Sequence, residues 1–448
     1  MDGIIHDSAA LPLGISLGTI AAYGVFLAIL LRQVSDRASR FVVIAIAVRL
    51  IMSAMPELSF RPSPLGLSWN AVASVATVGL ALLVLRRTAA WAMVIPPFAL
   101  ILLAITLASL VNHLMIDGVE VAIKYAYLMA MALLCYQSFR DHGIDRALLL
   151  MTAAFLLPLV LQLETLALGV AKASEADGSR SYIGGYNHEA AFSVILLCPI
   201  VLLSLNKRLK PLLNMLAIAA FAFGIILANY RTALIAMVPL IGFAFVSLGL
   251  RMFVANQRRA VLALMPVVLL ALFPAISYNF QDRFGVLGEV IDDPAMLARS
   301  PEDLAPDQGR LLSGRVNIWT HYLEGWRTAD ETRSAFGLGP GAWEQSIGIY
   351  AHNTLISTLY ELGVFGVCAI AGLWCWMLYL ALKSEKSLRA SLVAGHLGFI
   401  VLNMATMPFW LVEGLLLYAI LCGATLYGYL LGARPSTAIL PPARLASA

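Results

Sequence analysis

Arginine, histidine and asparagine side chains stand out in a chain that is otherwise apolar. The residues that could do chemistry are Arg180, His188, Arg231, Arg283, Arg315, His352 and Asn353. An arginine presents a rigid planar fork that matches phosphate oxygens and stays charged at any relevant pH. A histidine at a helix N-terminus is polarised toward its neutral form, which suits a general base near pH 7. The sequence places no carboxylate pair and no Cys/His cluster beside them, so this set favours transfer from a phosphate-activated donor without a metal or cofactor.

Each of these residues also has an ordinary structural explanation. Arg231 stands where a helix begins and can snorkel to the membrane interface. His188 can cap or pack against its helix, and Arg315 can contact lipid headgroups from the edge of an apolar stripe. Arg283 can be a plain loop cation. The residue types alone leave both interpretations open.

The elements that must position these residues are apolar runs near 20 residues long. Of the 448 residues, 60% are hydrophobic and 12% are charged. A helix needs about 20 apolar residues to cross hydrocarbon, and in lipid each segment must satisfy its own backbone amides, so we expect helices. We predict an all-α polytopic membrane protein with about 12–13 transmembrane helices. The expected spans are 13–31, 41–55, 68–85, 91–110, 121–137, 147–169, 188–205, 211–229, 232–250, 260–277, 354–382, 391–406 and 413–432.

The cysteines give no sign of a disulfide framework or a zinc site. All five lie inside apolar runs. They are Cys135, Cys198, Cys368, Cys375 and Cys422. Disulfides and structural zinc sites take their cysteines from loops with characteristic spacings. We therefore expect these thiols to be small helix-facing or lipid-facing groups.

Short loops rich in Lys and Arg alternate along the chain with loops that hold few cations. Cytoplasmic loops carry this excess, so the alternation predicts a multi-pass protein of the bacterial inner membrane with its C-terminus inside. We divide the chain into an N-terminal transmembrane bundle of about ten helices (1–276), a large periplasmic loop (277–351), C-terminal transmembrane helices (352–432) and a cytoplasmic tail (433–448). The candidate residues then face the periplasm.

The large loop contains its own helical pattern. Leu312, Val316, Trp319, Leu323 and Trp326 recur at alternating spacings of four and three. That is the apolar stripe of an amphipathic helix, which would lie along the membrane surface or cap the bundle. A tight turn follows at Gly337-Leu338-Gly339-Pro340-Gly341.

Several of these segments resemble the O-antigen ligase and polysaccharide polymerase family. His352-Asn353, nine residues, and then Gly363-Val364-Phe365-Gly366 match its HN-x9-G-x-x-G pattern. Four further segments occur in the family's order. They are the Arg-x-x-Gly, Asn, Ala-rich type of helix entry at Arg180 to Ala191, the helix start Asn229-Tyr230-Arg231-Thr232-Ala233, Ser313-Gly314-Arg315 with Trp319, and the glycine turn before His352. The resemblance covers roughly residues 180–370.

The resemblance implies an inverting, metal-independent glycosyl transfer. Such enzymes move an oligosaccharide from undecaprenyl diphosphate to a hydroxyl acceptor at the periplasmic face. By this resemblance His352 would activate the acceptor, Arg180 and Arg315 would stabilise the diphosphate, and Asn353 would orient the histidine or bond a sugar. Arg231, His188 and Arg283 would help to bind substrate. The glycines of the motif would let a neighbouring helix approach closely.

The acceptor stays open, and so does one other class of function. A ligase uses lipid A–core, a polymerase uses a growing glycan chain, and a related branch uses protein. The loop from Tyr278 to Tyr350 has eleven acidic and six basic residues, net −5, which leans only slightly to a polymerase. Membrane lipids are expected partners and nucleic acid is not. The alternative is a transporter or flippase, which would place polar groups near mid-membrane on broken helices. Here Arg49 and Glu164 are the main charges within the runs.

Overall fold

Most of the chain is described by a computed structural model. The described residues are 10–64, 66–173, 180–254, 256–258, 260, 293–305, 308, 311 and 314–433. Three predicted segments lie outside them: the helix at 260–277 apart from residue 260, the large loop up to residue 292 with Arg283, and the tail beyond residue 433. Within the described residues, strands occur as one short antiparallel pair, β1 (Lys172–Ala173) and β2 (Arg180–Ser181).

Helices dominate the rest of the described chain. The first group comprises α1 (Leu13–Arg32), α2 (Arg37–Ala54), α3 (Pro56–Ser59), α4 (Trp69–Val84), α5 (Ala89–Asn112), α6 (Met115–His142), α7 (Ile144–Ala154), α8 (Leu156–Ala167), α9 (Glu189–Leu205), α10 (Pro211–Leu227) and α11 (Arg231–Met252). The second group comprises the 3-10 turns η1 (Pro294–Ala298) and η2 (Pro301–Asp303), then α14 (Arg315–Arg327), α15 (Glu331–Phe336), α16 (Trp343–Ser346), α17 (Thr354–Lys383), α18 (Lys386–Ala405) and α19 (Val412–Gly432).

Eight of the described helices are long and apolar enough to cross a membrane by length and composition, with α7 and α8 taken as one. They are α1, α5, α6, α7–α8, α11, α17, α18 and α19, and α4, α9 and α10 are shorter apolar helices. The all-α membrane class is therefore confirmed. Each predicted run on described residues forms a helix, while the total of 12–13 transmembrane helices stays a prediction.

One predicted span, 147–169, is interrupted, and a proline explains the break. Pro158 has no amide hydrogen and its ring clashes with the carbonyl four residues earlier, which belongs to Ala154. The helix breaks at Phe155, between α7 and α8. The freed Ala154 carbonyl accepts a hydrogen bond of 2.5 Å from the Tyr23 hydroxyl of α1. The break thus gains a partner from a neighbouring helix.

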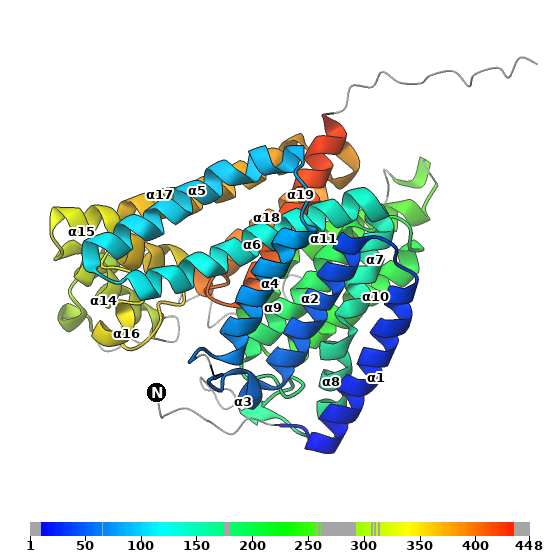
Figure 1. Ribbon diagram of the computed structural model, residues 1–448, viewed down its shortest axis with the longest axis horizontal. Helices are drawn as coiled ribbons and strands as arrows, with labels where there is room; N and C mark the ends of the chain where they lie inside the picture. Colours follow the sequence, from blue (N-terminus) through cyan, green and yellow to red (C-terminus); the bar gives the residue numbers. More distant parts are fainter. Residues whose placement is uncertain are drawn as a thin grey trace, which may run out of the picture.

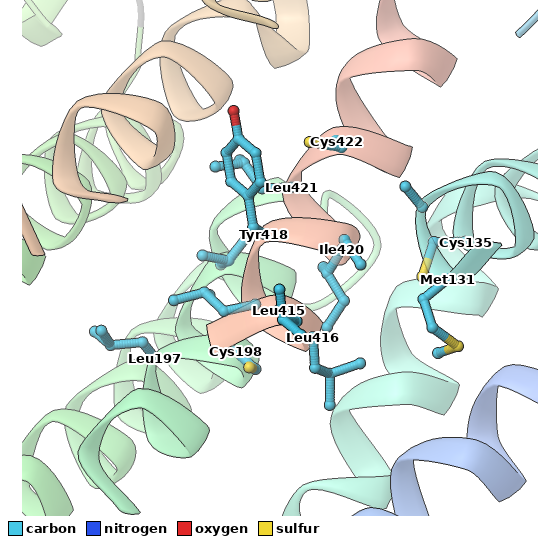
Figure 2. Close-up of a cluster of buried hydrophobic side chains, with 14 of the residues drawn as sticks. Met131, Cys135, Leu197, Cys198, Leu415, Leu416, Tyr418, Ile420, Leu421 and Cys422 are labelled. Carbon is cyan, nitrogen blue, oxygen red and sulfur yellow. The ribbon is translucent and has the colours of Figure 1, made fainter. Parts of the chain in front are cut away.

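The centre of the bundle is α19, which packs against α6 and α9 (Figure 2). Close packing of α19 on α6 requires a glycine, because a Cβ at Gly423 would lie 2.6 Å from the Cβ of Cys135. Cys198 and Cys422 are buried in the same core, whereas Cys368 and Cys375 are exposed on the apolar surface of α17. The structure records all five thiols as free, in line with the sequence.

Three long helices carry the candidate site away from the main bundle. In Figure 1, α5 and α17 run side by side and extend with α6 to the left, where α14, α15 and α16 gather. Helix α17 has 30 residues and is kinked at Gly363. The part after the kink is about 30 Å long, which matches the thickness of a hydrocarbon core. The part before the kink therefore extends beyond that length and meets the helices of the large loop.

Loop contacts divide the bundle into two ends. At one end, the Asn206 amide donates to the Asp145 carbonyl (2.9 Å) and Arg251 donates to the Lys207 carbonyl (2.8 Å). At the other end, the Asn112 amide donates to the Gly337 carbonyl (2.9 Å). Each contact joins loops that the charge alternation assigns to the same side. We call the end with Gly337 and the N-terminus of α17 the outer end; its periplasmic location stays a prediction.

Candidate functional site

Helix α14 fixes the backbone that leads into His352. Its buried face presents Trp319 and Tyr322. The Trp319 indole donates a 2.7 Å hydrogen bond to the Ala351 carbonyl, and the Tyr322 hydroxyl donates one of 2.9 Å to the Ile349 carbonyl. The predicted amphipathic helix therefore exists, and it caps the outer part of α17.

His352 adopts a left-handed backbone conformation at the entrance to α17. Its φ is 52°, and its ring centroid lies 4.0 Å from that of Tyr350. The pKa of His352 is lowered to about 4, mainly by burial and in addition by the nearby Arg315 and His188. The imidazole is therefore neutral at pH 7. Three residues from separate parts of the sequence, all predicted as site residues, are thus close enough to interact electrostatically.

Arg315 brings a positive charge that no anion among the described residues neutralises. It is the first residue of α14, where the helix dipole adds to the positive potential, and its side chain is half-buried. Among the described residues it makes no hydrogen bond or ion pair. A half-buried guanidinium without a carboxylate partner suits an anionic ligand.

His188 caps α9 and also faces the site. Its Nδ1 accepts the Ala190 backbone N–H at 3.0 Å, so in the neutral ring the proton is assigned to Nε2, which is left free to donate. Lys172 of β1 steadies this cap: its ammonium donates to the Asn187 carbonyl (2.9 Å) and lies 3.6 Å from the Glu189 carboxylate. The capping role that the sequence allowed is present together with an electrostatic role beside His352.

Asn353 serves as the N-cap of α17. Its Oδ1 accepts backbone hydrogen bonds from Leu355 (2.9 Å) and Ile356 (3.2 Å). Its Nδ2 donates to the Met404 carbonyl of α18 at 3.0 Å. These bonds fix the helix end next to His352, so the geometry gives Asn353 a positioning role. Its predicted contact with substrate stays a prediction.

The glycine turn docks onto a break in α17. Gly363 has φ 66° and interrupts the helical conformation. The carbonyls of Tyr360 and Glu361 accept backbone hydrogen bonds from Leu338 (2.8 Å) and Gly339 (3.0 Å). A Cβ on Gly363 would lie 2.3 Å from the Ala335 carbonyl oxygen of α15. The close approach of a neighbouring helix expected at this glycine is therefore found.

Among the described side chains, no contact joins Arg180 to His352. Arg180 is exposed on β2, and no hydrogen bond or ion pair of its side chain occurs among the described residues. Arg231 begins α11. The Tyr182 backbone N–H donates to the Leu227 carbonyl at 3.0 Å, which ties the hairpin to the turn before α11. The two arginines thus belong to one outer edge, while Arg283 lies outside the described residues.

Glu361 is a buried group that the sequence analysis missed. Its carboxylate accepts hydrogen bonds from the Ser357 hydroxyl (2.5 Å) and the Gly341 backbone N–H (3.0 Å). The sequence does show a carboxyl inside an apolar run, two residues before Gly363. This was a usable signal, since charged residues are costly in a membrane and usually face a polar partner or cavity.

Comparisons with known proteins add no further evidence. No protein-family model matches the chain, and no curated protein matches it. The functional argument therefore rests on the residues and their geometry.

Proposed function

We propose that the chain is a membrane glycosyltransferase. It transfers an oligosaccharide from undecaprenyl diphosphate to a saccharide hydroxyl at the periplasmic face of the bacterial inner membrane. The observation that carries the proposal is the neutral His352 beside Arg315, a cation with no anionic partner among the described residues. A neutral imidazole accepts a proton, and an unpaired guanidinium binds a phosphate.

The proposed glycosyl transfer needs neither a metal nor a redox partner. The acceptor oxygen forms a bond to the anomeric carbon of the donor, and the bond from that carbon to the phosphate oxygen breaks. The electron pair leaves with undecaprenyl diphosphate, and the acceptor proton passes to His352. Arg315, with His188 and the predicted contributions of Arg180 and Arg231, stabilises the charge that grows on the diphosphate.

The same charges should make the pKa of His352 depend on whether the donor is bound. Without a ligand, Arg315 and His188 help to hold the pKa of His352 low. A bound diphosphate neutralises the positive charge of Arg315, so the pKa of His352 rises when the donor is in place. The imidazole then becomes a stronger base at the moment that the acceptor hydroxyl needs one.

An assay with purified protein tests the proposal. The protein is incubated with an undecaprenyl-diphosphate-linked oligosaccharide, with and without lipid A–core, and the products are separated by gel and identified by mass spectrometry. Product formed only with lipid A–core makes the protein a ligase. A ladder of longer lipid-linked chains in its absence makes it a polymerase. Absence of transfer to either saccharide overturns the proposal and favours protein acceptors or the transporter alternative.

A further inference from the structure

The peptide bond that precedes His352 is held by a side chain of α14. The Trp319 indole donates to the Ala351 carbonyl at 2.7 Å, and both residues are buried. Because a peptide unit is planar, this hydrogen bond also fixes the backbone nitrogen of His352, about which its φ is defined. Tyr322 holds the Ile349 carbonyl in the same way, at 2.9 Å. Two side chains of α14 therefore fix the segment that leads into the histidine.

His352 needs this support because its backbone is strained. A φ of 52° is uncommon for a residue with a Cβ, and such conformations persist where the surrounding contacts determine them. On the other side of the histidine, Asn353 caps α17 and donates to the Met404 carbonyl at 3.0 Å. The imidazole thus extends from a Cα between two fixed neighbours, and its position against the Tyr350 ring depends on both.

Helix α14 links this support to the cation of the site. Arg315 and Trp319 are four residues apart, so they lie on adjacent turns of one helix face. Arg315 is also close enough to His352 to act on its pKa. A displacement of α14 would therefore move the guanidinium and the backbone of the histidine together.

We propose that Trp319 is a positioning residue for the glycosyl transfer, which holds the His352 imidazole in place through the Ala351 carbonyl. The inference rests on the proposed function and adds to it a residue that acts through His352. Trp319 is 9% exposed, so its ring is packed inside the protein and is not open to a sugar. Tyr322 has a smaller share in the same role, because the carbonyl that it holds lies three residues before the histidine.

The test compares two tryptophans of the same helix. Trp319→Phe removes the indole N–H that holds Ala351 and keeps an aromatic ring in the packing. Trp326→Phe is the matched control, because the Trp326 indole donates a similar hydrogen bond, 2.9 Å long, to the Ser334 carbonyl of α15. Tyr322→Phe is a milder second variant that loses only a hydroxyl. The full-length proteins are compared in nanodiscs by glycan transfer per folded molecule.

Trp319→Phe should lower kcat about tenfold, the effect of one lost hydrogen bond that positions the base. The KM for the lipid-linked donor should stay within about twofold of wild type, since the groups that bind the donor are retained. Tyr322→Phe should lower kcat about threefold, and the control should stay within about twofold of wild type.

Labelling with diethyl pyrocarbonate separates positioning from a general loss of structure. The reagent acylates neutral imidazole, so labelling rates at several pH values, read by peptide mass spectrometry, report the exposure and the pKa of His352. Burial is the largest cause of its low pKa, so Trp319→Phe should speed the labelling and raise the midpoint by about half a pH unit. The exposed His321 of α14 is the internal standard, and its labelling should not change.

Two results would overturn the inference while the proposed function stands. One is a kcat for Trp319→Phe within about twofold of wild type, or a loss that Trp326→Phe shares in full. The other is unchanged labelling of His352 in Trp319→Phe. If Trp319→Phe does not fold, Tyr322→Phe decides by the same two measurements. Absence of transfer by the wild-type protein would instead overturn the proposed function, and with it any part of Trp319 in the reaction.

Discussion

Two arginines occupy regions of the molecule that treat positive charge in opposite ways. Arg49 of α2 is buried, its Nε lies 3.7 Å from the Glu413 carboxylate of α19, and its guanidinium donates to Asn70 of α4. Arg315 of α14 is half-buried, and the described residues give it no such partner. A buried charge must be paired, or the fold loses several kcal/mol. The charge of Arg49 therefore holds helices together, whereas the charge of Arg315 is available for the anionic ligand that we propose.

The largest expected effect is at His352, the neutral group beside the unpaired charge. His352→Ala should lower kcat by about 10²–10⁴-fold, because the acceptor loses its proton acceptor. His352→Asn should give the same loss, and since asparagine tolerates positive φ it separates chemistry from backbone strain. The measurement is transfer per folded molecule. His321→Ala on the exposed side of α14 serves as the control, and normal transfer by both His352 variants would remove the catalytic assignment.

Arg49→Met should be the most damaging change to stability. It leaves the Glu413 carboxylate buried without a cation, which costs about 3–5 kcal/mol of unfolding free energy. The double variant Arg49→Met with Glu413→Gln should recover most of that loss, since no charge is then left unpaired. Thermal unfolding in nanodiscs measures both. If the single variant is as stable as wild type, the ion pair of Arg49 with Glu413 does not stabilise the fold.

Arg315→Gln should show the opposite of Arg49→Met, a large loss of transfer with little loss of stability. Transfer should fall about 10²–10³-fold, as expected when one group that stabilises a developing anion is removed. The unfolding free energy should change by no more than about 0.5 kcal/mol, because no protein partner is lost. Arg315→Lys should restore only part of the activity, since lysine lacks the bidentate fork. Equal losses of stability and transfer would mean that Arg315 is structural like Arg49.

The smallest effect is a pH dependence. The pKa of His352 is lowered from 6.5 to about 4. The kcat/KM of the enzyme should therefore stay constant below neutral pH until the pH approaches about 4, where protonation of His352 removes the activity. The folded state binds fewer protons than the unfolded state between these values. The contribution of His352 to the unfolding free energy is therefore fully present above pH 6.5 and is lost as pH falls toward 4.

In Arg315→Gln the midpoint of this profile should move upward by less than about one pH unit, since burial is the larger cause of the low pKa. Profiles of kcat/KM for the two proteins, measured in the same buffers, provide the check. A midpoint that does not move would mean that Arg315 has no influence on the pKa of His352.

Hydropathy predicted the described helices well because each long apolar run must form its own hydrogen bonds in lipid. The break at Phe155 was also present in the sequence as Pro158, but a proline inside an apolar run can equally be tolerated, so its effect depended on Tyr23 of α1 being in reach. Local pattern predicts a helix, and tertiary partners decide whether it is continuous.

The site was predicted in part. The motif around His352 and the helix carrying Arg315 pointed to residues close enough to interact electrostatically, as His188 from much earlier in the chain also does, while their roles stay predictions. Glu361 was missed because its partner, Gly341, lies in an irregular turn 20 residues away, where no periodicity indicates a contact. Arg180 could not be located from its loop, since a surface hairpin has no buried face to fix where it sits.

The docking of the glycine turn on α17 has a consequence for the order in which the protein assembles. Leu338 and Gly339 leave the ribosome before Tyr360 and Glu361, whose carbonyls are their hydrogen-bond acceptors. Trp319 likewise precedes its acceptor, Ala351. A nascent chain that stops short of α17 therefore holds all of the proposed site residues but lacks the carbonyls on which the glycine turn docks, because a contact can form only after both of its members have been synthesised. The outer face is thus a late product of biosynthesis, completed only after α17 has been made.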